Sequence, residues 1–381
     1  MEGIDVLRGL AIAAMVILNL SGVLLQGTPP YALRFIGSIA APVFIMLSGF
    51  MVALTAERHE FRYFLLNRSM WILTVAVFVD FFVWRLYPFM GVEVLYCIAA
   101  SIPLAYLSLK LSSWQRLALI ALVLAAAPLL RDLLGYANFP TEYYTWNQKV
   151  FQTHEDHLLG PAQQWLVDGW FPLFPWLAFA LIGAHLGKVM QENWRGVFLT
   201  QTLVIGVAMT VAGVVLYITM PPNDFARGVW SELFYPPSLQ YSILFMGIAV
   251  LLLYAFLLAQ AWPWMLVPLA PFSTIGKAAL GMYVLHLALA VHVGLRLTAG
   301  WNSLSLGEYA IAYVAMLMAL WSGAQLFLIF RRWQPGITSP TLRTITVGVV
   351  LGGAGLLIAA WIADGSGFTN GLHDLMKNRY Y

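Results

Sequence analysis

Apolar stretches that are each long enough to cross a membrane dominate the chain. A membrane-spanning helix needs roughly twenty apolar residues, and about eleven stretches of this sequence meet that length. Only 10% of the 381 residues are charged, whereas a soluble domain carries about a quarter. We therefore expect an all-α, polytopic integral membrane bundle. The predicted spans are 6–25, 35–55, 70–87, 92–110, 115–131, 170–189, 197–219, 236–260, 273–296, 309–330 and 342–363.

The lysines and arginines predict how these spans are oriented. With the N-terminus in the cytoplasm, more basic residues fall in the inner loops than in the outer loops, as the positive-inside rule requires. We expect one integral membrane domain, 1–381, with a long loop at about 132–169 on the outer face. The net charge of +3 is too small to indicate a nucleic-acid partner.

The loop at 132–169 mixes acidic and aromatic side chains and contains His154 and His157. A loop of this length is usually functional or disordered. Its composition suits a carbohydrate or another polar acceptor, and equally a cap lying on the membrane surface. The two histidines flank Glu155 and Asp156 and could hold a divalent ion, but a solvated loop is the better interpretation. We therefore expect no metal.

Arg8 and Asn19 lie on the first predicted span, eleven residues apart. Eleven residues are about three helical turns, so both side chains lie on one side of the helix, roughly 16 Å apart along it. The span thus carries a cation near one membrane face and an amide near the other. Polar groups inside a membrane are costly, so this pair is a functional hypothesis by default.

Four polar residues fall in the outer half of the predicted bundle: Asn19, Asp80, Glu93 and His286. A histidine within a span is either a general base or a hydrogen-bonding group that locks two helices together. Asp80 lies among aromatic residues and either pairs with a cation such as Arg85 or takes part in catalysis. The same two alternatives hold for Glu93.

A second polar set, at the inner face, contains Arg8, Arg58, Arg62 and Arg68. Guanidinium groups suit bidentate contacts with phosphates. Ordinary positive-inside topology explains these arginines without any ligand, and the loop alone favours that interpretation. The two sets together fit a protein that works on both sides of a membrane.

Four segments, taken in order, resemble a known family. The segment 5–12 (DVLRGLAI), followed by Asn19, is similar to the first helix of the heparan-α-glucosaminide N-acetyltransferase catalytic domain and its bacterial relatives. The segment 41–50 (APVFIMLSGF) resembles the next helix. The segment 171–176 (FPLFPW), followed by Gly183 and Gly187, resembles a later helix, and 276–286 resembles the late helix that ends in Tyr-x-x-His.

The resemblance implies a polytopic acyltransferase that takes an acyl group from cytosolic coenzyme A and delivers it to a glycan on the far side. The inner arginines would then hold the coenzyme A phosphates, with Ser48 also on the donor side. The outer groups would activate the acceptor. This strengthens the expectation of phosphate binding by Arg8, Arg58, Arg62 and Arg68.

The chain departs from the family pattern at one point. In the heparan enzyme a histidine follows the first helix in the outer loop, whereas the corresponding loop here, 26–31, has none. Related O-acyltransferases have a histidine where this chain has Asn19. The base must therefore come from elsewhere, and the candidates are His286, Asp80, Glu93, His154 and His157.

We expect a membrane acyltransferase that moves an acyl group, in the first place acetyl, from cytosolic acyl-CoA to an extracytoplasmic glycan or glycolipid. The expected location is a bacterial inner membrane, with lipid around the bundle and a homo-oligomer as a further option. His286 is the first choice as base, Asn19 polarises the carbonyl, and Asp80 and Glu93 complete the catalytic set. The alternatives are a transporter or flippase of a lipid-linked or small polar substrate, and an inactive relative.

Overall fold

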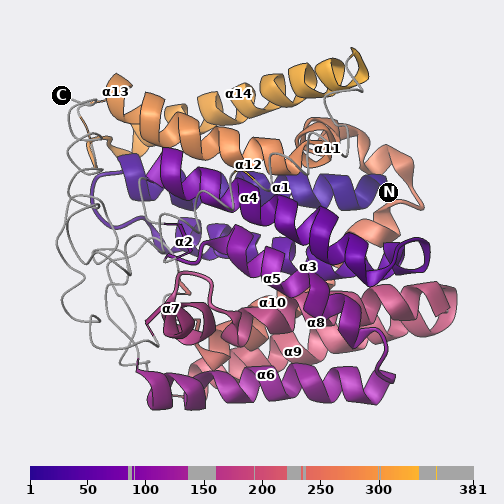
Figure 1. Ribbon diagram of the computed structural model, residues 1–381. Helices are drawn as coiled ribbons and strands as arrows, with labels where there is room; N and C mark the ends of the chain where they lie inside the picture. Colours follow the sequence, from indigo (N-terminus) through magenta and orange to yellow (C-terminus); the bar gives the residue numbers. More distant parts are fainter. Residues whose placement is uncertain are drawn as a thin grey trace.

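Every regular element in the described part of the chain is helical (Figure 1). In this computed structural model the described residues are 1–84, 88–89, 91–135, 160–192, 194–220, 233–234, 237–298, 300, 302–333 and 349. The long helices run roughly parallel to one another and form one bundle, with α12 and α14 on one side and α6 and α9 on the other. The all-α, polytopic fold class is confirmed.

The described elements follow one another along the chain in this order. The α-helices are α1 (Glu2–Leu24), α2 (Tyr31–Gly37), α3 (Ala40–Thr55), α4 (Met70–Val79), α5 (Val94–Ser108), α6 (Ser113–Leu134), α7 (Gly160–Gln163), α8 (Leu173–Glu192), α9 (Leu199–Thr219), α10 (Leu239–Ala259), α11 (Ala270–Lys277), α12 (Ala279–Ala288), α13 (Leu295–Leu297) and α14 (Leu306–Trp333). The π-helical segments are η2 (Tyr63–Ser69), η3 (Asp80–Trp84), η5 (Gln164–Asp168), η6 (Trp194–Phe198) and η9 (Leu289–Gly294), and the 3₁₀ segments are η1 (Ala56–Arg58), η7 (Pro263–Met265) and η8 (Val267–Leu269).

Among the described residues, eight helices are long and apolar enough to cross a membrane, or nine if one bent pair counts as a span. The shorter apolar helix α5 occupies the predicted span 92–110. Each of the first ten predicted spans thus has a helical counterpart, and the eleventh, 342–363, lies outside the described residues. The predicted span 273–296 differs in shape, because the helix bends by 81° between Lys277 and Ala279.

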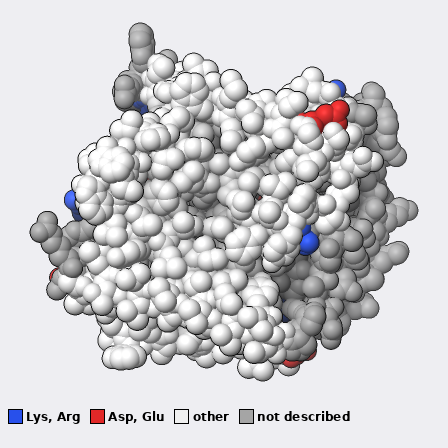
Figure 2. Space-filling model, turned by 180° about the vertical axis from the view of Figure 1, so that it is seen from behind, with Lys and Arg blue, Asp and Glu red and all other residues white. Residues whose placement is uncertain are grey.

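The surface of the bundle suits a lipid environment. In α1 and α8, 72% of the residues in the most apolar 18-residue stretch are buried, whereas in α9 and α14 only 17% are. Large apolar side chains such as Ile218, Ile311 and Phe330 are exposed on these two helices. Figure 2 shows a broad face with few charged side chains. Helices α1 and α8 therefore form the interior, and α9 and α14 face lipid.

Glycines allow the central helices to pack with their backbones in contact. A Cβ atom added to Gly9 would overlap the carbonyl oxygen of Phe272, and one added to Gly276 would overlap that of Asp5. The same relation joins α3 to α8, where Gly183 lies against the carbonyl oxygen of Met46. Small residues at helix interfaces are a common device in membranes, where close packing drives association. The contact between α1 and α11 at Gly276 lies directly before the bend between Lys277 and Ala279.

We expect Gly276→Ala to destabilise the bundle by about 1–3 kcal/mol, because the added methyl group forces α11 away from α1. Gly281→Ala is the matched control, since a Cβ atom there meets only a ring atom of Phe327 at 4.0 Å. Thermal unfolding of the two purified variants in the same detergent measures the difference. Equal unfolding temperatures would show that α1 and α11 can separate freely.

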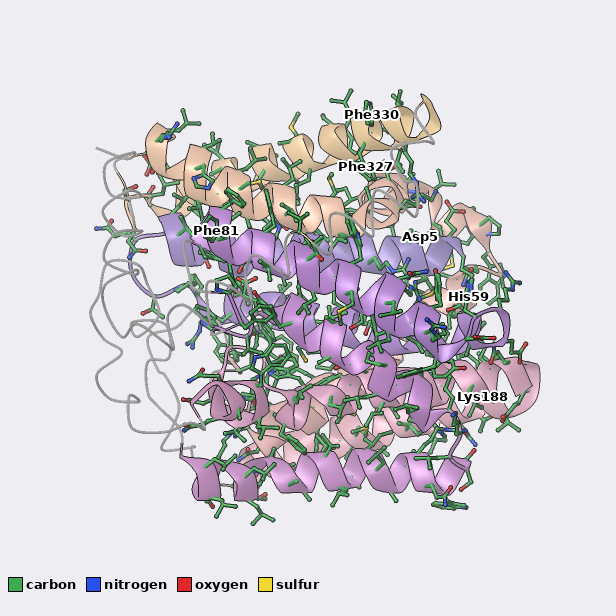
Figure 3. All side chains as sticks on the ribbon, in the orientation of Figure 1. Asp5, His59, Phe81, Lys188, Phe327 and Phe330 are labelled. Atoms are coloured by element: carbon green, nitrogen blue, oxygen red, sulfur yellow. The ribbon has the colours of Figure 1, made fainter. Side chains whose placement is uncertain are left out.

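The two ends of the bundle differ in the residues they carry. Asp5, His59 and Lys188, from α1, the loop after η1 and α8, lie at one end, and Phe81 lies toward the other (Figure 3). The chain alternates between these ends as the predicted topology requires. We call the end with Asp5 the inner end and the opposite one the outer end, following the predicted orientation.

Candidate active site

The central contact of the site joins α1 to α12. Asn19 Nδ2 lies 2.9 Å from His286 Nε2. The His286 side chain is buried, at 1% exposed, and Asn19 is partly exposed. His286 Nδ1 lies 3.3 Å from the carbonyl oxygen of Met282. Because a carbonyl oxygen only accepts, Nδ1 carries the proton, and Nε2 accepts from the Asn19 amide.

Glu93 joins this contact through Tyr283. The Tyr283 hydroxyl donates to Glu93 Oε2 at 2.9 Å. The rings of Tyr283 and His286 meet edge to face, with centroids 5.4 Å apart. One tyrosine on α12 therefore contacts both the histidine ring and the carboxylate at the start of α5.

Asp80, the first residue of η3, completes the group. Its Oδ2 accepts from the Tyr96 hydroxyl at 2.5 Å, and that hydroxyl in turn accepts from the Phe89 backbone N–H at 3.2 Å. Asp80 is fully buried, and it lies close enough to Glu93 for their charges to repel. Its Oδ1 atom has no hydrogen-bond partner among the described residues. Arg85, the partner suggested by the sequence, lies outside the described residues.

Hydrogen bonds from η5 and the residues directly after it hold the connection between η3 and α5 in place. The backbone N–H groups of Trp170 and Phe171 donate to the carbonyl oxygens of Gly91 and Val92, both at 2.9 Å. The Trp165 indole donates to the Phe89 carbonyl at 3.0 Å. Phe89 and Val92 adopt positive φ angles of 70° and 49°, which are strained for such residues and are often found at functional sites. These bonds fix the start of α5, and with it Glu93.

The structure thus brings together the four outer residues that the sequence suggested, Asn19, Asp80, Glu93 and His286, through direct bonds and the two tyrosines. Sequence reasoning missed Tyr283 and Tyr96 as members of the group. The spacing in the sequence could have identified both tyrosines. Tyr283 precedes His286 by three residues, and Tyr96 follows Glu93 by three. On a helix, residues three apart lie on the same face.

The inner end contains a second group of charges. Arg8 forms an ion pair with Asp5, 3.0 Å from NH1 to Oδ1, and it lies close enough to Arg68 on η2 for the two cations to repel. Arg58, the last residue of η1, and Arg62, directly before η2, are both exposed.

The Ser48 hydroxyl, on α3, donates within its own helix to the Ile45 carbonyl at 2.7 Å. In the described part of the chain no group of three metal-ligating side chains is found. His154 and His157 lie outside that part.

A family model described as heparan-alpha-glucosaminide N-acetyltransferase, catalytic, matches residues 1–222, more than half of the chain. The chain belongs to this family. The resemblance seen in the sequence is confirmed, and the chain is a multi-pass membrane protein of an acetyltransferase family. The matched region contains Arg8, Asn19, Asp80 and Glu93, whereas His286 lies beyond it. No curated protein matches the chain.

Proposed function

We propose that this chain transfers an acyl group, in the first place acetyl, from cytosolic acyl-CoA to a hydroxyl or amine of an extracytoplasmic glycan or glycolipid. The observation that carries the proposal is the hydrogen bond between Asn19 and His286. It joins the first helix of an acetyltransferase family to a buried histidine whose Nε2 lone pair accepts from an amide donor. Such a pair provides a base and a carbonyl-polarising group in one place.

The chemistry follows from the tautomer of His286. Nε2 takes the proton of the acceptor hydroxyl or amine while the acceptor atom attacks the thioester carbonyl. The Asn19 amide N–H turns from Nε2 to the carbonyl oxygen and stabilises the negative charge that develops there. The carbon–sulfur bond then breaks, and the coenzyme A thiolate takes the proton from His286. The acylated acceptor and free coenzyme A are the products.

The donor side of the proposal rests on Arg8 and Arg68. Arg8 pairs with Asp5 and also lies close enough to Arg68 for the two guanidinium groups to repel one another, so a bound anion would stabilise this arrangement. Phosphate is the anion that arginine binds best in bidentate geometry. Arg58 and Arg62, exposed nearby, would meet further phosphates of coenzyme A, and Ser48 would lie along the path of its acyl arm.

Arg68→Gln should raise the KM for acetyl-CoA by about tenfold or more, since one charge-assisted hydrogen bond contributes about 1.5–3 kcal/mol. The kcat should change little, because the phosphates bind alike in ground and transition states. Initial rates at varied acetyl-CoA measure both values. Arg296→Gln is the matched control, an exposed arginine on α13. An unchanged KM in Arg68→Gln would remove this residue from the donor site.

The setting proposed for this reaction is a bacterial inner membrane. The partners are acyl-CoA on the inner side, a glycan or glycolipid acceptor on the outer side, and the surrounding lipid. A homo-oligomer is compatible with the exposed apolar faces of α9 and α14, although lipid covers such faces equally well. Acyl-CoA acts as donor substrate, and the proposed chemistry needs no metal.

The direct test is incubation of the purified protein with radiolabelled acetyl-CoA and a glycan and lipid extract of bacterial membranes. We expect label in the glycan or lipid fraction, and none when coenzyme A is labelled only in its adenine. Binding of acetyl-CoA without transfer would indicate an inactive relative. Neither binding nor transfer would contradict the enzyme and leave a transporter or flippase as the better description.

A further inference from the structure

Two carboxyl groups, Asp80 and Glu93, lie close together inside the outer half of the bundle. Among the described residues neither forms an ion pair with a cation. Charge is expensive in such a place, because burial removes water and a membrane offers no replacement. Two neighbouring carboxylates therefore do not both ionise, as one negative charge disfavours the other.

The difference in burial decides which carboxyl carries the charge. Glu93 is partly exposed and accepts from the Tyr283 hydroxyl. Asp80 is fully buried, and its Oδ1 atom has no partner in the described part of the chain. An ionised Asp80 would leave that oxygen as a bare buried acceptor, which costs the full desolvation penalty. A proton on Asp80 removes the charge, and only the smaller cost of an unpartnered neutral group remains.

We infer that Asp80 and Glu93 share one proton, which Asp80 holds while Glu93 carries the single charge, and that Tyr283 couples this charge to His286. The inference rests on the proposed function only for its last part. During acyl transfer His286 becomes an imidazolium, and the negative Glu93 lies one side chain away to stabilise it. Tyr283 is a positioning residue, because it holds Glu93 with its hydroxyl and His286 with its ring. Tyr96 holds Asp80 in the same way.

Infrared spectroscopy tests the shared proton without any need for turnover. The purified protein, in a maltoside detergent that has no carbonyl band, should show the C=O stretch of a protonated carboxyl group at neutral pH. The band should disappear in Asp80→Asn and remain in Glu93→Gln. In the unaltered protein, aspartate labelled with ¹³C at its side-chain carboxyl should shift the band, so the assignment does not depend on either variant folding. A missing band, or a band removed only by Glu93→Gln, would overturn the inference.

The coupling to His286 is tested by Tyr283→Phe, which removes the hydroxyl bond to Glu93 and keeps the ring beside His286. We expect kcat to fall by about tenfold, as for the loss of a hydrogen bond to a charged group, with an unchanged KM for acetyl-CoA. Tyr313→Phe is the matched control, because its hydroxyl bonds only the Ala13 carbonyl, at 3.2 Å. Equal kcat values in the two variants would overturn the role of Tyr283. Absence of turnover in the unaltered protein would instead contradict the proposed function.

Discussion

Replacing His286 by alanine is expected to lower the rate of acyl transfer by about a hundred- to ten-thousand-fold, the usual contribution of a general base. His286 presents a lone pair at Nε2, because the Met282 carbonyl keeps the proton on Nδ1. Alanine removes that lone pair and leaves the Asn19 amide without its partner. Transfer of label from radiolabelled acetyl-CoA, measured at saturating donor, gives the change in kcat.

His292→Ala is the control for this variant. His292 lies on the same helical run, in η9, and its ring bonds the Phe82 carbonyl at 2.9 Å, away from Asn19. We expect it to keep most of the activity. If His286→Ala turned over at the rate of His292→Ala, the histidine would only lock α12 to α1, and the base would have to be sought elsewhere.

Asn19→Ala is expected to lower kcat by about a hundred- to a thousandfold, the range seen when one donor to a developing oxyanion is removed. The KM for acetyl-CoA should stay nearly constant, because the amide N–H acts on charge that develops only in the transition state. Initial-rate measurements over a range of acetyl-CoA concentrations separate the two parameters.

Asn19→Asp sharpens this experiment, because aspartate keeps the size of the side chain and replaces the amide donor by a negative acceptor. It should be at least as slow as Asn19→Ala, since a carboxylate repels the developing oxyanion. An Asn19→Asp variant as active as the unaltered protein would show that the side chain does not polarise the carbonyl.

The multi-pass helical fold could be predicted from the sequence, because an apolar run of span length has few alternatives in a membrane. The bend between Lys277 and Ala279 could not, since the apolar pattern continues through it. It depends on α11 packing against α1, where Gly9 and Gly276 bring two backbones into contact. The angle of the bend therefore depends on contacts between segments far apart in the sequence, and the local order of apolar residues does not reveal such contacts.

The candidate site was predictable as a set of residues and not as an arrangement. Residue type and depth selected Asn19 and His286, and the family resemblance supported both. Their hydrogen bond joins residues 267 positions apart, a distance in sequence that helical periodicity does not bridge. The closeness of Arg8 to Arg68 has the same origin, because it depends on how α1 and η2 lie side by side.

Acyl transfer across the bundle is measured most directly in proteoliposomes that hold the protein in one orientation, with acetyl-CoA on one side only. Radiolabelled acetyl-CoA is supplied at the inner end, and a glycan and lipid extract of bacterial membranes is supplied at the opposite side. We expect labelled acceptor on that opposite side. In His286→Ala the amount of labelled acceptor should fall to the level of empty liposomes. Label that stays with coenzyme A, or that reaches acceptor equally in His286→Ala, would contradict acyl transfer at the contact between Asn19 and His286.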